Sequence, residues 1–329
     1  MDAYAKDLIR VLSLVISFCA ICFGIPGNVF VIHIIRKHPR FRTVHNLFHA
    51  SLAMADLTTC LIGTPSFLLA WCFSAGDTAF RGFMCTLSVS LATTCNLINI
   101  ITLMKISIVR VYVVYKQKYS MSKKTGVFSV AVTWGAGMLS FLVYIIKGPG
   151  PIEHACAGST EIVDAIGDLP VMILFFFIPA LAFLALMCIG SYVYLLRQAK
   201  RMRNLIHPIT TISHIIHSGH TPPWWGNDPN GRGRSGQGDD TDVNTEPLSA
   251  NFIANMAATS SILTMVYVLS TLPTIVLSVM QIWQTIPAPI VEMCFVPLYF
   301  SMFLNPYIYA SRNRFFKHEF HKLILKCLQ

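Results

Sequence analysis

Seven long apolar runs constrain the fold of this chain more than any other feature of its sequence. About 20 consecutive apolar residues are enough for a helix to cross a bilayer. A helix also satisfies its own backbone hydrogen bonds, which lipid cannot do. The runs cover about residues 8–35, 46–73, 83–109, 125–146, 170–196, 251–283 and 288–310. We therefore expect an all-α membrane protein, a bundle of seven transmembrane helices.

The content of charged residues agrees with a surface that faces lipid. Only 12% of the residues are charged, whereas a soluble domain carries about 25%. The formal net charge is nevertheless +10. We interpret this excess as a signal of topology and of contact with anionic lipid, and we expect no nucleic-acid partner.

The lysine and arginine residues lie mostly on one side of the predicted membrane. Of the 25 such residues, 20 fall in the loops after the first, third and fifth runs or in the C-terminal tail. Positively charged loops stay in the cytoplasm. We therefore expect a multi-pass protein of the plasma membrane, with the N-terminus outside the cell and the C-terminus in the cytoplasm.

The third run connects a cysteine to an arginine across the membrane. Cys85 and Arg110 are 25 residues apart, which is about 38 Å along a helix and slightly more than the apolar thickness of a bilayer. Cys85 is therefore expected at the outer face and Arg110 at the cytoplasmic face. Such a helix can report an event outside the cell to the inside.

Asp56 lies deep in the second run. An aspartate within a membrane costs several kcal/mol unless it is paired, hydrated or neutralised, so it is a functional residue by default. Asn99, Ser301 and Asn305 are the polar residues expected to form a cavity with it. The alternative is a protonated Asp56 that is satisfied by hydrogen bonds alone.

Lys105 is a second ionisable residue within a run. It precedes Arg110 by five residues, or about 7.5 Å along a helix. We expect its flexible side chain to extend to the cytoplasmic interface. Contact with a cytoplasmic partner and repulsion of Arg110 are the alternatives.

Composition divides the rest of the chain. The stretch 204–250 is rich in Gly, Pro, His, Ser and Asp without apolar periodicity, and we expect a disordered cytoplasmic loop. Residues 312–329 place apolar side chains at helical spacing against basic ones, which is typical of an amphipathic eighth helix on the membrane surface. We therefore predict a transmembrane domain over 1–311 and a helix and tail over 312–329.

Eight markers, in this order along the chain, resemble the rhodopsin-like (class A) G protein-coupled receptors. They are GxxGN ending at Asn28, LAMAD ending at Asp56, Cys85, Arg110, Trp134, Pro179, Pro273 and NPYIY over Asn305–Tyr309. Within that family the stretch FRTVHNLFHASLAMADL looks closest to melatonin-like and opsin-like receptors.

The resemblance implies roles for these residues. It makes Arg110, Pro273, Asn305, Pro306 and Tyr309 the parts that switch the receptor on and couple it to a G protein. It also implies that the cavity around Asp56, Asn99, Ser301 and Asn305 holds a sodium ion, with Asp56 as the ligand.

The resemblance further implies a disulfide between Cys85 and Cys156 across the outer loops. Cys72 and Cys294 also lie near the outer face, so another partner is open. Cys327, beside the amphipathic tail, suits S-palmitoylation. An unmodified thiol at Cys327 is the alternative.

The spacing of the family implies a ligand pocket between the outer halves of four helices. Its lining comprises Ala92, Thr93, Asn96, Met172, Phe175, Thr274, Ser278, Phe295 and Tyr299. Ala92 stands where amine receptors place an Asp, and Tyr299 stands where opsins hold retinal on a Lys, so we expect no retinal. We predict a small, largely apolar and uncharged extracellular ligand, although each residue alone could equally pack between helices.

The chain departs from the family near Arg110. The usual acid before that arginine is Val109, and the usual Trp two residues before Pro273 is Thr271. Raised basal signalling and poor coupling are both consistent with these changes. The runs carry neither a nucleophile beside a base nor a cluster of metal ligands, so we expect no enzyme.

Three functions follow from these observations. The first is a receptor that activates a heterotrimeric G protein, with arrestin as a further partner. The second is a non-coupling seven-helix receptor. The third is a transporter or channel, which would need more intramembrane charges than Asp56 and Lys105 supply.

Overall fold

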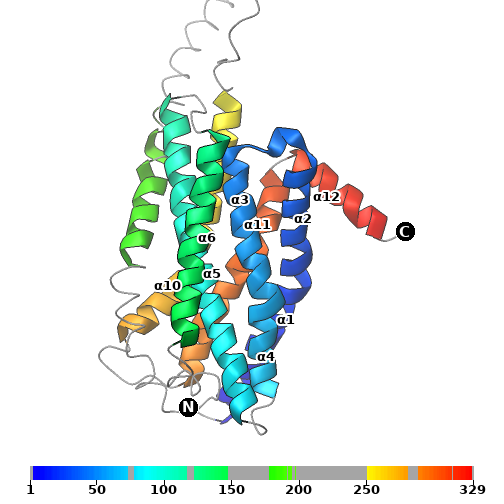
Figure 1. Ribbon diagram of the computed structural model, residues 1–329, viewed down its shortest axis with the longest axis vertical. Coiled ribbons are helices and arrows are strands. Elements are labelled where there is room, and N and C mark those ends of the chain that lie inside the picture. The colour runs from blue at the N-terminus through cyan, green and yellow to red at the C-terminus, as the bar shows by residue number, and fades with distance from the viewer. Residues whose placement is uncertain are drawn as a thin grey trace, which may run out of the picture.

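The computed structural model describes residues 3–72, 78–116, 122–146, 178–190, 192–194, 197, 250–280, 288–312 and 314–327. Throughout this part of the chain the regular structure is helical. The long helices stand side by side as an elongated bundle, and the last helix projects from one end of it (Figure 1). The prediction of an all-α bundle is confirmed.

The first two membrane segments each consist of two helices joined by a π-helical turn. The first comprises α1 (Ala3–Cys19), η1 (Ala20–Gly24) and α2 (Ile25–Lys37), and the second α3 (Val44–Thr58), η3 (Thr59–Gly63) and α4 (Thr64–Cys72). The later helices are α5 (Thr78–Lys116), α6 (Lys123–Ile146), α10 (Ala250–Met280), α11 (Ala288–Arg312) and α12 (Arg314–Cys327).

Five helical stretches in the described part of the chain are long and apolar enough to cross a membrane. They are Val11–Lys37, Val44–Ala70, Ala79–Val113, Lys123–Ile146 and Ala258–Leu277. These agree with the first four predicted runs and the sixth. The fifth run is described over 178–190 as a shorter apolar helix, and the seventh corresponds to α11, which packs along α10 and α1.

Both π-helical turns come just before a proline. Proline has no backbone N–H, and its ring clashes with the carbonyl group four residues earlier. For Pro26 that carbonyl belongs to Cys22 in η1, and for Pro65 it belongs to Leu61 in η3. The wider π turn gives each proline room while the segment continues as a helix.

The largest apolar core surrounds α5, which contacts α3, α4, α6 and α10. On α5, Ile106, Val109 and Val113 belong to this core, together with Phe48 and Leu52 of α3. Val109, which stands where the family has an acid, is therefore a core residue. It packs in a cluster whose members are all apolar or aromatic.

Helix α6 lies at the edge of the bundle and exposes much of its surface, yet it approaches α5 closely. A Cβ atom added at Gly137 would lie 2.7 Å from two side-chain carbons of Ile98. Trp134 Nε1 also donates a 3.0 Å hydrogen bond to Ser51 Oγ of α3. Small residues allow helices in lipid to approach each other in this way.

Lys105 does not extend toward the interface, contrary to our expectation. Its Nζ donates a 2.6 Å hydrogen bond to the Ser129 carbonyl and a second bond to the Thr133 hydroxyl, both on α6. Because α6 lies so close to α5, these acceptors are within reach of the ammonium group. The lysine therefore joins two helices, and this needed the tertiary structure to be seen.

The tail helix α12 packs on the protein as well as presenting a polar face. The ring of Phe316 makes an edge-on contact with Phe41, with centroids 5.1 Å apart, and Phe320 makes one with Phe30 at 4.7 Å. Part of the apolar face predicted to lie on the membrane therefore covers α2 and the turn that follows it.

A contact between Glu319 and His38 also holds α12, and it is an ion pair when the histidine is protonated. Glu319 Oε2 lies 3.5 Å from His38 Nε2, at the end of α2. Burial raises the pKa of Glu319, but His38, Lys322 and Lys37 outweigh burial and bring the pKa below its ordinary value. The charges around this helix therefore favour an ionised glutamate at neutral pH.

Two glycines on α6 give a matched test of this packing. We expect Gly137→Ala to lower the free energy of unfolding by about 1–3 kcal/mol, because the new methyl group overlaps Ile98. Gly135→Ala on the same helix meets no atom within 4 Å and shares the change in helix propensity. Thermal unfolding of both variants in the same detergent measures the difference, and equal midpoints would contradict the close approach.

Candidate functional site

Buried polar side chains form a continuous column inside the apolar bundle. Burying such groups is costly unless each finds a partner, so their arrangement identifies where this protein uses polar chemistry. The column extends from Asp56, in the middle of the second membrane segment, to the end of the bundle where α5 ends, which we call the Arg110 end. Its members are Asn28, His45, His49, Asp56, Asn99, Arg110, Asn305 and Tyr309.

Asp56 is the centre of the column. Asn99 Nδ2 of α5 donates a 2.8 Å hydrogen bond to Oδ1 of the carboxyl group, and Asn305 Nδ2 of α11 donates a 2.8 Å bond to Oδ2. Asp56 is 1% exposed. One carboxyl group therefore joins three helices that are far apart in the sequence.

The fourth residue of the predicted cavity makes a different bond. The hydroxyl of Ser301 donates to the Leu298 carbonyl of its own helix at 2.8 Å. Asn99 Oδ1 is buried and has no hydrogen-bond partner in the described part of the chain. An unpartnered amide oxygen beside a carboxyl group is the kind of donor set that a hard cation prefers, so these residues fit a sodium ion.

Asn28 satisfies a carbonyl group that a proline leaves free. Pro306 cannot donate to the carbonyl of Met302, four residues earlier. Asn28 Nδ2 donates to that carbonyl at 2.9 Å, and also to the Gly24 carbonyl at 3.0 Å. A Cβ atom at Gly27 would lie 3.0 Å from Pro306. The GxxGN and NPYIY motifs are thus two halves of one contact between α2 and α11.

Tyr309 forms the next part of the column. Its hydroxyl is hydrogen-bonded to His49 Nδ1 of α3, and the two rings meet edge-on with centroids 4.6 Å apart. His49 Nε2 in turn lies 3.0 Å from His45 Nε2. All three side chains are buried. The last residue of NPYIY is therefore held against α3 by His49, which His45 contacts in turn.

Arg110 lies at the end of the column and is 0% exposed. Its Nη1 donates to Ser261 Oγ of α10 at 2.8 Å, and its Nη2 to Cys188 Sγ of the helix over 178–190 at 3.3 Å. The ion pairs found in the described residues do not include it, and its Nε has no partner there. Arg110 therefore connects α5 to two other helices through neutral groups.

The family pattern is altered at Thr271 of α10, where hydrogen bonds form within α10 and between α10 and α5. The hydroxyl of Thr271 donates to the carbonyl of Tyr267 on its own helix. The hydroxyl of Tyr267 donates to Asn96 Oδ1 at 2.5 Å. Pro273 lies two residues after Thr271 in the same helix. The altered position is therefore a buried, satisfied threonine rather than a large ring.

The predicted ligand pocket is described in part. Ala92, Thr93 and Asn96 are half-buried on α5, and the amide of Asn96 is already bonded to Tyr267. Thr274 is buried on α10, and Tyr299 is half-buried on α11. The remaining side chains lie outside those the structure describes: Met172, Phe175, Ser278 and Phe295.

The cysteine predictions are also described in part. Cys85 is buried and takes part in a disulfide bond. Cys72 is a free thiol, so it is not the partner of Cys85. Cys156 and the side chains of Cys294 and Cys327 lie outside the described residues, and the pairing of Cys85 with Cys156 stays a prediction.

Sequence reasoning missed four residues of the column and its surroundings. His45 and His49 are 11 and seven residues before Asp56, a spacing that puts all three on one face of a helix. That signal was present in the sequence. Ser261 and Cys188 had none, because a single serine or cysteine in an apolar helix does not indicate which arginine it meets.

Comparison with known families places the whole column inside one match. The profile of the family described as "7 transmembrane receptor (rhodopsin family)" matches residues 27–309. The match begins next to Asn28 and ends at Tyr309, so it includes every member of the column.

Curated relatives cover different parts of the chain. Neuropeptide Y receptor type 2 of Mus musculus and of Homo sapiens are each 31% identical over 131 residues, which is 38% of this chain and 33% of the receptor. Octopamine receptor beta-2R of Drosophila melanogaster is 26% identical over 350 aligned positions, 96% of this chain and 60% of that receptor. The match thus spans about a third of the length of the neuropeptide Y receptors. The finer likeness to melatonin-like and opsin-like receptors stays a prediction.

The bond between His49 and Tyr309 can be measured by a double-mutant cycle. We expect Tyr309→Phe and His49→Leu each to lower the free energy of unfolding, and the pair to be non-additive by about 1 kcal/mol, because each variant removes the same bond. The matched control is Tyr307→Phe, whose hydroxyl bonds to the Phe23 carbonyl instead. Additivity of Tyr309→Phe with His49→Leu would mean that the two residues do not interact.

Proposed function

Because the chain belongs to the rhodopsin family of seven-transmembrane receptors, we propose that it couples binding of an extracellular ligand to activation of a heterotrimeric G protein. Members of this family are receptors rather than enzymes, and the bundle is a multi-pass membrane protein. The Arg110 end is the cytoplasmic end in this proposal, which follows the distribution of Lys and Arg.

The observation that carries the proposal is the burial of Arg110 between α10 and the helix over 178–190. Arginine keeps its charge at all physiological pH values. Moving α10 away from α5 would break the bond to Ser261 and present the guanidinium group to the cytoplasm. A G protein that bound the freed arginine would stabilise the open form, which is how binding shifts a conformational equilibrium.

The partners of Arg110 suggest a closed state of modest stability. A hydrogen bond from a charged group to a neutral one contributes about 1.5–3 kcal/mol at most, and sulfur is a weak acceptor. Val109, which is packed in the core, offers no carboxylate to strengthen this closure. The sequence was consistent both with raised basal signalling and with poor coupling, and these contacts favour raised basal signalling.

The column supplies a route from the middle of the membrane to Arg110. Asp56 holds Asn305, and one turn later on α11 Tyr309 is held by His49. A change in the hydrogen bonds of Asp56 would therefore shift α11 against α3. We propose that Asn305, Pro306 and Tyr309 transmit this shift, with Pro273 as the flexible point of α10.

A sodium ion fits the part of the column around Asp56, away from the Arg110 end. Asp56 would supply the negative charge, and the unpartnered Asn99 Oδ1 a neutral oxygen. When bound, the ion would neutralise the buried carboxylate and favour the closed arrangement of the three helices around it. Retinal is not part of the proposal, since Tyr299 offers no amine for a Schiff base.

The ligand proposed for this receptor is small, largely apolar and uncharged. Ala92 provides no counter-ion for a cationic amine, and Asn96 already bonds to Tyr267, so few free polar groups remain among the described lining residues. The octopamine receptor is named for an amine and the neuropeptide Y receptor for a peptide, and this chain lacks the Asp that amine receptors place at Ala92.

Two other functions are weaker. A non-coupling receptor would agree with Val109 and Thr271 but not with an arginine kept buried between neutral partners. A transporter or channel would need a chain of ionisable groups along a path, and Lys105 is bonded to α6 rather than directed into the column. Arrestin is a further partner implied by the family, as is S-palmitoylation at Cys327.

Basal G protein activation in cells tests the proposal directly. We expect Ser261→Ala to raise ligand-free signalling roughly tenfold, because it removes about 1.5 kcal/mol from the stability of the closed state. Arg110→Ala should abolish the signal of the wild-type chain. Ser270→Ala, at another buried serine of α10, is the matched control and should leave the signal unchanged.

Surface expression must be equal for the wild-type chain and its three variants in that assay. No change with Ser261→Ala, in a wild-type chain that does signal, would exclude the proposed closure. A chain that reaches the surface and activates no member of a full panel of G proteins, even with Ser261→Ala, would favour the non-coupling receptor.

Sodium binding is tested without any ligand. We expect purified receptor to gain about 1.4 kcal/mol of stability when NaCl is raised to ten times the dissociation constant at constant ionic strength with choline chloride. Asp56→Asn should remove this dependence while keeping the shape of the side chain. An equal sodium effect in both chains would place the ion elsewhere.

A further inference from the structure

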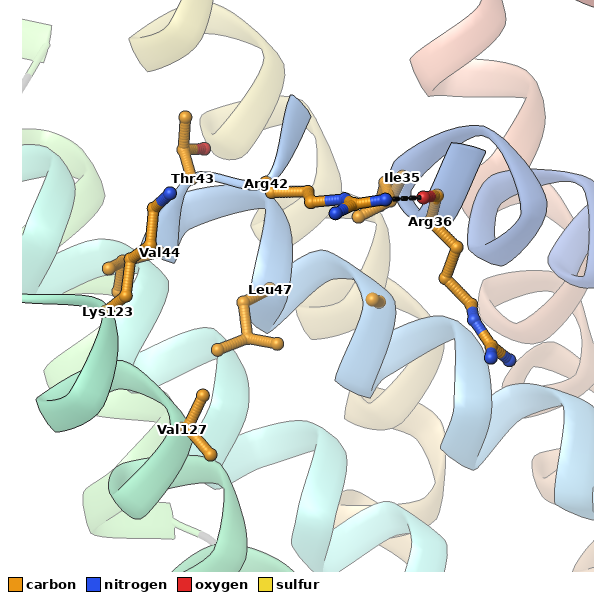
Figure 2. A pocket seen from close by; sticks show the side chains of 9 residues that line it. Ile35, Arg36, Arg42, Thr43, Val44, Leu47, Lys123 and Val127 are labelled. Atoms are coloured by element: carbon orange, nitrogen blue, oxygen red, sulfur yellow. Dashed lines mark hydrogen bonds between the residues drawn. The ribbon is translucent and has the colours of Figure 1, made fainter. Parts of the chain in front are cut away.

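A hollow of about 360 Å³ opens at the Arg110 end, between the ends of three membrane segments (Figure 2). Its size falls within the range of about 300–1,000 Å³ that is usual for sites of small molecules. No member of the polar column belongs to its lining. It is lined by Ile35, Arg36, Arg42, Thr43, Val44, Leu47, Ala50, Lys123 and Val127.

The depth of the hollow follows from the helices around it. The first span ends at Lys37, the second begins at Val44 and the fourth begins at Lys123. The ends of spans lie at the level of the lipid headgroups. The hollow therefore reaches from the headgroup level into the apolar part of the bilayer, on the side that carries most of the Lys and Arg residues.

The inner wall of the hollow is apolar and faces lipid. Figure 2 shows the side chains of Leu47 and Val127 directed toward each other from α3 and α6. Val127 is 57% exposed and its neighbour Phe128 is 71% exposed, although both lie within a membrane span. A Cβ atom at Gly126 would lie 2.9 Å from Val44, so the two helices meet at the base of the hollow and fix its shape.

The outer rim is basic. Arg36, Arg42 and Lys123 belong to the lining, and none of its nine members is acidic. Arg42 Nη2 donates a 2.7 Å hydrogen bond to the Arg36 carbonyl at the end of α2, as drawn in Figure 2. This bond holds the guanidinium group across the rim and uses only one of its five N–H groups.

Two helices also begin at the rim. Thr43 caps α3 by accepting a 3.3 Å bond from the Asn46 amide, and Ser122 caps α6 by accepting one of 3.2 Å from the Thr125 amide. The first turn of each helix carries a partial positive charge. These dipoles add to the charge of the three basic side chains in the same place.

We propose that this hollow binds an anionic glycerophospholipid of the cytoplasmic leaflet. The phosphate headgroup lies against Arg42 and Lys123, and an acyl chain lies along Leu47, Ala50 and Val127. A ligand for this place must be negative at one end and apolar at the other, and it must arrive through the bilayer. Basic hollows between helices on the cytoplasmic side recognise such headgroups.

Binding there would hold α2, α3 and α6 together at their ends. These helices contribute Asn28, His49 and the acceptors of Lys105, respectively. The proposal depends on a membrane bundle of this shape and not on coupling to a G protein. A lipid that occupied the hollow would stabilise the purified protein whether or not the receptor signals.

Native mass spectrometry of the full-length chain in detergent tests the proposal. The probes are phosphatidylinositol 4,5-bisphosphate, phosphatidylserine and phosphatidylcholine. We expect Arg42→Gln with Lys123→Gln to weaken binding of the anionic lipids by roughly 30-fold, since each basic residue contributes about a factor of five. The matched control is Lys317→Gln with Lys322→Gln, which removes the same charge from exposed positions of α12 and should change binding by less than about twofold.

A second pair of variants keeps the charges and alters the apolar wall. Val127→Phe should fill part of the hollow and weaken the binding of anionic lipid. Val132 is also exposed on α6 but lies outside the lining, so Val132→Phe should leave that binding unchanged. Both positions are exposed, so folding should be preserved, and thermal unfolding checks this.

Three results would overturn the proposal. One is equal binding of anionic lipid by the wild-type chain and the Arg42→Gln, Lys123→Gln chain. Another is equal binding by the Val127→Phe and Val132→Phe chains. The third is binding of soluble inositol trisphosphate as tight as that of the lipid, since the apolar wall would then contribute nothing and the site would recognise a free phosphate.

Discussion

The buried carboxyl group of Asp56 is the interaction on which the rest of this structure depends. It receives hydrogen bonds from Asn99 of α5 and Asn305 of α11, and lipid offers no water to replace them. Three helices must therefore meet at one depth and in one rotation. The apolar packing around α5 follows from this arrangement, because helices in lipid gain little from apolar contact alone.

Proline placement extends the same constraint along the bundle. Pro306 frees the carbonyl of Met302, and Asn28 satisfies it from α2. Pro26 and Pro65 are accommodated by π-helical turns. At these three prolines the defect in helical hydrogen bonding is thus repaired by a neighbouring element or by a local change of pitch. Such repairs suit a protein that must change shape. They hold the helices in one arrangement, and other arrangements can still satisfy the backbone hydrogen bonds.

Arg110 illustrates how a familiar position can work with different partners. The family pattern leads one to look for an acid beside it, and Val109 is instead a core residue. The arginine is bonded to Ser261 and Cys188, while His49 holds Tyr309 on the other side of the column. The closed arrangement is therefore distributed over several hydrogen bonds, and the acceptors of Arg110 are neutral groups. The basic hollow at the same end gives the surrounding lipid a means to act on these helices.

The sequence alone determined that the chain is a helical membrane bundle, because apolar runs of this length have no other stable form in lipid. It also identified Asp56, Asn99, Asn305 and Arg110 as polar residues of interest, since burial makes such residues costly. The tertiary structure decided which of them touch. Helical periodicity gives the face of a residue on its own helix, but not the rotation and depth of the neighbouring helices. For that reason Ser261, Cys188 and the acceptors of Lys105 emerged only when the helices were packed together.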